Sequence, residues 1–292
     1  MAISIVIRTY NEQRHLPELL DAIRSQECSD SFEVVLVDSG STDATLDIAR
    51  SHACRILSIS KEDFTFGRSL NMGCAAAGGN ILVFVSGHCI PTNERWLENL
   101  TRPIADGAVA YSYGRQIGGT GTKFSESRIF GKYYPEASAL PQEGFFCNNA
   151  NAALDRRAWE THRFDEQLTG LEDMELGKRL IAAGARIGYV SDAVVYHLHD
   201  ESWRAIKNRF EREAIALQAI MPQVHISFGD FVNYVASAIV MDMRVALAQR
   251  QLLRNLRSIT AYRLMQFWGS YAGNNEHRKL SRAMKDKYFY PT

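Results

Sequence analysis

Polar, turn-forming residues follow three short apolar runs of the sequence, at the points where buried strands would end. The segments are RTYNE after residues 3–7, DSGSTD after residues 34–37 and SGHCIP after residues 81–85. Hydroxyl, carboxylate and imidazole groups at such points can bind a nucleoside, a phosphate or a cation. Taken singly, each segment is equally typical of a turn or a helix cap.

Two further clusters come later in the chain. The segment LEDMELGKRL places Glu172 and Asp173 just before a helical pattern that starts near Met174, and YHLH places His197 and His199 at the end of an extended pattern. A helix N-terminus favours ionised carboxylates, so one of the two acids can act as a base near neutral pH.

The elements that must position these groups alternate between two kinds of pattern. The three apolar runs are rich in β-branched residues, which is typical of strands covered on both faces, and helical patterns lie between them. This order predicts an α/β fold with a mostly parallel, doubly wound sheet flanked by helices, and such sheets bind ligands at the carboxyl ends of their strands.

Composition excludes several classes of protein. Lys and Arg balance Asp and Glu at 33 each, so nucleic acid is not an expected partner. Five cysteines without CxxC spacing, and a start without an export signal, predict a cytoplasmic protein. The most apolar stretch, residues 228–247, is interrupted by Asp230, Asp242 and Arg244, so we do not expect a spanning helix.

Together, the motifs resemble those of the family 2 glycosyltransferases, which have a GT-A, Rossmann-like fold that binds nucleotide-diphospho-sugars. The segments that carry the resemblance are SIVIRTYNE, VVLVDSGSTDAT, GRSLNMGCAAAGG, SGHCIP, GLEDMELGKRL and YHLH. The resemblance implies a GT-A catalytic domain over residues 1–215 and leaves residues 216–292 as a helical C-terminal extension.

The implied activity is inverting transfer of a hexosyl or deoxyhexosyl group from a nucleotide-diphospho-sugar to a hydroxyl of a glycan or lipid-linked acceptor, in the synthesis of a capsule, O-antigen or exopolysaccharide. A sugar nucleotidyltransferase would carry a Gly-rich basic loop after the first strand, which RTYNEQRHL lacks. A non-catalytic sugar-binding module of the same fold would not need the acids of LEDMELGKR.

The resemblance also implies roles for single residues. Asp173 matches the catalytic base, and Glu172 would orient the acceptor or cap the helix. The residues expected to bind the nucleotide-sugar are Thr9, Tyr10, Glu12, Asp38, Arg68, Asn71, Ser86, His88 and Asn149.

The family's Asp-x-Asp metal motif is replaced here by Ser86-Gly87-His88. Three interpretations of His88 follow: it ligates a divalent cation together with His197 or His199, it donates directly to the diphosphate, or it is a structural histidine. Neutral imidazole suits Mn²⁺ better than Mg²⁺, which prefers oxygen ligands.

Residues 225–292 carry ten Lys and Arg against four Asp and Glu, within a neutral protein. Apolar residues recur there at helical spacing, and arginines lie between them. This pattern predicts basic amphipathic helices that lie on an anionic membrane surface, at the inner face of the cell membrane. Packing against the catalytic domain, or against a second subunit in a homodimer, fits the pattern equally well.

Overall fold

The computed structural model describes residues 2–276 and 282–289. The chain forms two compact units. The first contains residues 1–117, 134–167 and 172–198, and the second contains residues 118–133, 168–171 and 199–292.

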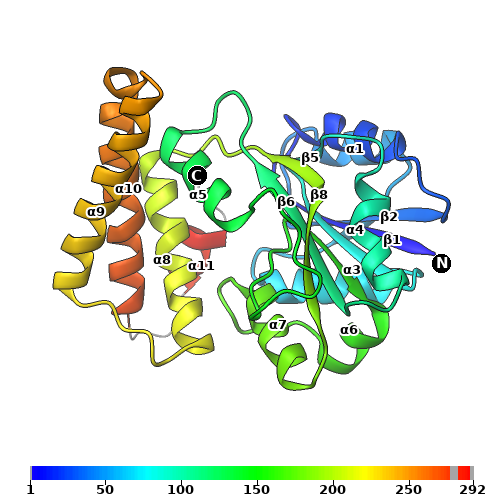
Figure 1. The fold of residues 1–292 in the computed structure, drawn as a ribbon. Helices are drawn as coiled ribbons and strands as arrows, with labels where there is room; N and C mark the ends of the chain where they lie inside the picture. Colours follow the sequence, from blue (N-terminus) through cyan, green and yellow to red (C-terminus); the bar gives the residue numbers. More distant parts are fainter. Residues whose placement is uncertain (1, 277–281, 290–292) are drawn as a thin grey trace. The chain divides into compact units, whose positions relative to one another are not determined.

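The first unit is built on one sheet flanked by helices (Figure 1). The sheet has eight strands in the order β3-β2-β1-β4-β7-β6-β8-β5. Strands β3, β2, β1, β4, β6 and β8 run in one direction, whereas β7 and β5 run antiparallel to their neighbours. The predicted mostly parallel sheet is therefore confirmed. The strands are β1 (Ile3–Thr9), β2 (Phe32–Asp38), β3 (Arg55–Ser58), β4 (Ile81–Ser86), β5 (Cys89–Pro91), β6 (Tyr111–Ile117), β7 (Asn151–Asp155) and β8 (Ile187–His197).

Helices cover both faces of this sheet. One face of β1 presents Ile3, Ile5 and Ile7 to a core shared with α1 and α4. On the other face α3 lies so close that a Cβ on Gly73 would come 2.4 Å from Val6. The helices of this unit are α1 (Leu16–Arg24), α2 (Thr45–Ser51), α3 (Phe66–Ala76), α4 (Trp96–Ala105), α6 (Arg156–His162) and α7 (Glu172–Ala182).

The second unit is helical among its described residues. It contains α5 (Phe124–Tyr133), α8 (Trp203–Ile220), α9 (Phe228–Ala248), α10 (Leu252–Asn274) and α11 (Arg282–Phe289). Helices α8 and α10 pack with their backbones in direct contact at two glycines of α10. A Cβ on Gly269 would lie 2.3 Å from the carbonyl oxygen of Lys207, and a Cβ on Gly273 would lie 2.1 Å from that of Glu211. The domain boundary predicted at residue 215 lies inside α8, and the two compact units divide the chain differently.

Helix α9 is, among the described residues, the one helix that is long and apolar enough to cross a membrane, although no spanning helix was expected from the sequence. Only 17% of the most apolar 18-residue stretch of this helix is buried inside the protein. Length and composition alone are weak evidence for a span, and Asp242 in this helix forms a buried ion pair with Arg263 of α10, at 2.7 Å.

Candidate functional site

The carboxyl ends of the parallel strands bring most of the predicted site residues of the first unit to one edge of the sheet. Thr9, Asp38, Ser86 and His197 are the last residues of β1, β2, β4 and β8. Two groups of side chains form there: a histidine cluster (His88, Cys89 and His197) and a carboxylate cluster (Arg8, Asn149, Glu172 and Asp173).

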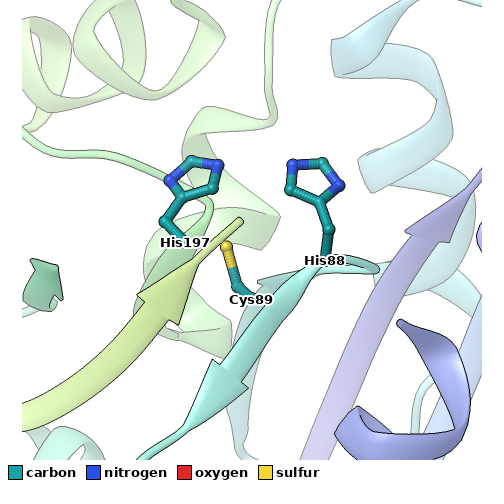
Figure 2. Close-up of side chains that lie close together, drawn as sticks. All are labelled: His88, Cys89 and His197. Carbon is teal, nitrogen blue, oxygen red and sulfur yellow. The ribbon is translucent and has the colours of Figure 1, made fainter. Parts of the chain in front are cut away.

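The histidine cluster is assembled by strand pairing. His88 lies in the turn between β4 and β5, and the register of β5 with β8 pairs Cys89 with His197. The two imidazole rings stack with their centroids 5.2 Å apart. Figure 2 shows the rings side by side, with the sulfur of Cys89 pointing toward the space between them. One potential ligand atom from each residue lies within 4.8 Å of the other two.

Hydrogen bonds orient both rings in the same way. His88 Nδ1 lies 2.8 Å from the carboxylate of Glu12, and His197 Nδ1 lies 2.6 Å from Gln116 Oε1. Both partner oxygens are acceptors, so each Nδ1 carries the proton. In a neutral ring with the proton on Nδ1, Nε2 is the nitrogen that carries the lone pair, and metal-ligating histidines use this tautomer.

The orientation of Gln116 is itself fixed. Asn148 Oδ1 accepts from the backbone N–H of Ala150 at 3.0 Å, so this atom is the oxygen of that side chain. Gln116 Nε2 donates to the same oxygen at 3.0 Å, which turns Gln116 Oε1 toward His197.

The donor set of the histidine cluster fits some ions better than others. Imidazole nitrogen and thiolate sulfur are the ligands that Zn²⁺ and similar transition metals prefer, whereas Mg²⁺ prefers oxygen. Burial strongly raises the pKa of the Cys89 thiol, and the nearby Glu12 carboxylate adds to the rise. The thiol therefore stays protonated near neutral pH unless a cation displaces its proton.

His199 belongs to a different group of side chains, in the second unit. Its Nδ1 lies 2.8 Å from Glu126, and Arg209 lies 2.9 Å from Glu126 and 2.8 Å from Glu201. Arg209 already places a positive charge between the two carboxylates. Burial, and then Arg209, lower the pKa of His199. Of the two later histidines predicted as metal ligands, the structure therefore brings His197, and not His199, into a shared cluster with His88.

A substitution at Gly87 would test whether the hydrogen bond to Glu12 orients the ring of His88. A Cβ on Gly87 would lie 2.8 Å from Cγ of Glu12 and 3.1 Å from its Cδ. We expect Gly87→Ala to displace this carboxylate and so release the ring of His88, which should weaken Zn²⁺ or Mn²⁺ binding by about 10- to 100-fold. Metal titration by calorimetry measures this change.

The matched control is Gly121→Ala, because a Cβ at Gly121 meets no atom within 4 Å. Unchanged metal affinity in Gly87→Ala would show that Glu12 does not orient a ligand.

The carboxylate cluster lies where α7 begins. The helix starts at Glu172, so both acids lie in its first turn and not before it as expected from the sequence. Asp173 accepts from the backbone N–H of Asn149 at 2.9 Å and from that of Met174 at 2.8 Å. These bonds hold the carboxylate in one orientation. The backbone carbonyl of Asp173 accepts from the Cys147 thiol at 2.9 Å.

The environment of Asp173 differs from the one predicted. Burial and the neighbouring Glu172 raise the pKa of Asp173 to about 7, which outweighs the two backbone hydrogen bonds that lower it. Burial therefore outweighs the helix N-terminus, which was expected to keep this group ionised. A carboxylate with a pKa near 7 is well matched to proton abstraction at neutral pH.

Arg8 forms an ion pair with one of the two acids, Glu172. Its guanidinium bonds to Glu172 at 3.1 Å and lies 4.8 Å from the ring centre of Phe66. Glu172 is thus engaged with a cation, whereas among the described residues no ion pair to Asp173 is found. Of the two carboxylates, Asp173 is the one available to take a proton.

Asn149 lies beside Asp173. Its side chain is only 2% exposed, its Oδ1 accepts from the Tyr111 hydroxyl at 2.5 Å, and its Nδ2 has no hydrogen-bond partner among the described residues. An unpartnered buried donor is costly, so this amide is suited to a ligand oxygen.

Thr9 and Asp38 organise the loop after β2. Asp38 is buried and accepts from the Thr9 hydroxyl at 3.0 Å, from the Ser41 hydroxyl at 2.5 Å, and from the backbone N–H groups of Gly40 and Ser41 at 2.9 Å. These four bonds use the acceptor capacity of the carboxylate. Asp38 therefore shapes the loop, and a nucleoside would have to meet the loop's other groups.

Tyr10 is half-buried, and its hydroxyl accepts from Lys61 at 2.9 Å, while the ammonium lies 4.8 Å from the ring centre. Ser86 is half-buried at the end of β4, where its N–H donates to the Ala150 carbonyl at 3.3 Å. Both residues lie at the sheet edge where the resemblance places the donor.

Arg68 and Asn71 are engaged within the protein. Asn71 is buried, donates to Phe164 O and Glu166, and accepts from Trp159 and the N–H of Phe164. All its donors and acceptors are used, so we assign it to packing rather than to the donor site. Arg68 bonds to Glu166 at 3.0 Å.

Sequence reasoning missed three residues of this edge: Arg8, Cys89 and Gln116. A charged residue inside the apolar run IVIRT was a signal for Arg8, and the direct adjacency to His88 was a signal for Cys89. Nothing in the sequence indicated Gln116.

Comparisons with known proteins support the fold and the family. The family model described as Glycosyl transferase family 2 matches residues 4–163. The O-antigen chain rhamnosyltransferase RfbN of Salmonella typhimurium is 26% identical over 289 residues, which cover 92% of this chain and 91% of the relative. The O-antigen chain rhamnosyltransferase WbaN of Salmonella anatum is 27% identical over 286 residues, which cover 91% and 90%.

Among solved structures, the mannosyltransferase PcManGT from Pyrobaculum calidifontis, in complex with GDP-Man and Mn²⁺, has a similar fold. Its TM-score is 0.66 at 19% sequence identity, over 94% of this chain and 88% of that one. The predicted GT-A fold is thereby confirmed. With a family model that matches more than half of its residues, the chain belongs to glycosyl transferase family 2.

Proposed function

We propose that this protein is an inverting glycosyltransferase that moves a sugar from a nucleotide-diphospho-sugar to a hydroxyl of a glycan or lipid-linked acceptor in surface polysaccharide synthesis. The observation that carries the proposal is the buried carboxylate of Asp173, which is held by two backbone N–H groups and has a pKa raised to about 7. A binding module has no use for such a group, and a transferase needs one.

In the proposed reaction, the acceptor oxygen bonds to the anomeric carbon while the bond from that carbon to the diphosphate breaks. Asp173 takes the acceptor's proton, and the nucleoside diphosphate leaves with the electron pair. Attack from the face opposite the diphosphate inverts the anomeric centre. Arg8 keeps Glu172 engaged, so the proton goes to Asp173.

The histidine cluster supplies two ways to bind the diphosphate. His88, Cys89 and His197 would hold a transition-metal ion, Zn²⁺ or Mn²⁺ rather than Mg²⁺, and such an ion neutralises phosphate charge when it is bound. In the absence of a metal ion, His88 Nε2 would hydrogen-bond a diphosphate oxygen directly once the ring is protonated. Glu12 and Gln116 orient the rings in either case.

The sugar is proposed from the relatives. Both long relatives are rhamnosyltransferases, so a deoxyhexose is the first donor to test. The unpartnered Nδ2 of Asn149 would donate to a sugar hydroxyl. A lipid-linked acceptor would place the enzyme in the cytoplasm, at the inner face of the cell membrane.

A thermal-shift panel tests the proposal. We expect dTDP-rhamnose, compared with GDP-mannose and UDP-glucose, to raise the melting temperature by about 5 °C at 100-fold excess over Kd, with a larger rise when Zn²⁺ or Mn²⁺ is added. The best-binding donor is then assayed for transfer to a lipid-linked glycan. Binding without transfer to any acceptor would favour a sugar-binding module, and the absence of binding to every donor would reject the proposal.

A further inference from the structure

The turn that joins α9 to α10 carries large apolar side chains on its outside. We call residues 241–257 the hairpin tip; Figure 1 shows the two helices antiparallel, joined at this turn. Met241 is 60% exposed, Leu247 is 64% exposed and Leu253 is 93% exposed. A helix in water normally turns such residues inward, so the hairpin tip is suited to an apolar environment.

The same surface is positively charged. Arg244, Arg250, Arg254 and Arg257 are exposed, and none of them forms an ion pair with a described residue. The single acid of the hairpin tip, Asp242, is buried and accepts from Arg263 at 2.7 and 3.0 Å. Uncompensated arginines around exposed leucines match the anionic headgroups and acyl boundary of a phospholipid bilayer.

We propose that the hairpin tip docks on an anionic bilayer, with Leu247 and Leu253 in the acyl boundary and the arginines among the headgroups. A second copy meeting the same surface would oppose arginine to arginine, with no exposed acid in the hairpin tip to compensate. The proposal concerns binding alone, so it does not depend on the transfer reaction.

The buried ion pair of Asp242 also favours docking of the hairpin tip on the membrane surface over a membrane-spanning α9. The ion pairs of Asp242 with Arg263 at 2.7 Å, and with Arg128 at 3.8 Å, tie α9 to α10 and α5. A spanning α9 would carry this buried acid into hydrocarbon, which is costly.

The experiment is flotation of the full chain with two kinds of vesicle: pure phosphatidylcholine, and phosphatidylcholine mixed with phosphatidylglycerol. We expect recovery with the anionic vesicles only, and its loss at high salt, because salt screens the arginines. The double variant Arg254→Gln/Arg257→Gln should bind about 25-fold more weakly, at about fivefold per arginine.

Leu253→Ser tests the apolar contact separately, because it removes the apolar side chain without adding a charge, and at 93% exposure the change should leave the fold intact. The matched controls are Val232→Ser, at the other end of α9 and 50% exposed, and Arg204→Gln, exposed on α8. Both controls should float like the wild type.

Four results would overturn the proposal. Equal recovery with both vesicle types, or recovery with neither, removes the anionic bilayer as the partner. Bound protein that resists extraction by salt and alkali would indicate a spanning α9. A stable dimer in sedimentation velocity that Leu253→Ser dissociates would assign the hairpin tip to a second copy.

Discussion

Asp173→Asn should lower the turnover of sugar transfer by at least 100-fold while the affinity for the donor changes little. The amide keeps the size of the carboxylate and its place in the first turn of α7, but it cannot take a proton from the acceptor, and loss of a general base costs about 10²- to 10⁴-fold. The measurement is paired: transfer rate with a competent acceptor, and donor affinity by calorimetry.

The pH dependence gives an independent readout. Because burial and Glu172 raise the pKa of Asp173 to about 7, the wild-type rate should rise with pH up to about 7 and then level off. One pH unit below that pKa only about a tenth of the base is ionised, so the rate should be about tenfold lower there.

Two further variants serve as controls for the loss of turnover in Asp173→Asn. Glu160→Gln removes an exposed carboxylate outside the site and should leave the rate unchanged. Glu172→Gln removes the partner of Arg8, and a larger loss there than in Asp173→Asn would transfer the role of base to Glu172. If the donor affinity of Asp173→Asn collapses too, the residue belongs to the nucleotide site instead.

His88→Ala/His197→Ala should weaken nucleoside-diphosphate binding by at least 100-fold, because both oriented imidazoles of the histidine cluster are lost. Calorimetry with and without EDTA separates the two roles of the cluster. If a metal ion bridges the diphosphate, EDTA lowers wild-type affinity to that of the double variant and leaves the variant unaffected. If His88 donates directly, EDTA changes neither protein.

His225→Ala provides the control, since His225 is an exposed histidine of the second unit. A double variant that melts earlier yet binds the nucleotide as tightly as wild type would make His88 and His197 purely structural.

The sheet and its functional edge were predictable from local patterns. The runs at 3–7, 34–37 and 81–85 are β-branched and bounded by polar turns, and they form β1, β2 and β4 as expected. Strands that share a direction end together, so the polar residues that follow them had to converge. Antiparallel β7 was not predicted, because five residues of alanine, asparagine, leucine and aspartate carry no strand pattern.

The chemistry of the edge depends on contacts between residues far apart in the sequence. Cys89 joins His197 only through the pairing of β5 with β8, and the sequence contains no sign of that register. The raised pKa of Asp173 depends on its burial, which requires the packed structure. Asn71 was expected to bind the nucleotide-sugar, because its four hydrogen bonds within the protein cannot be predicted from its neighbours in the sequence.

The bond between Asn149 and Asp173 uses the main chain of one residue and the side chain of the other. Any residue except proline supplies that N–H. A substitution at position 149 therefore changes the side chain proposed to face the sugar but keeps the backbone N–H that orients the carboxylate of Asp173. If these proposed roles hold, the choice of sugar and the transfer of the proton depend on different groups. A lineage could change the sugar it transfers by mutation at this position while its catalytic carboxylate stays in place.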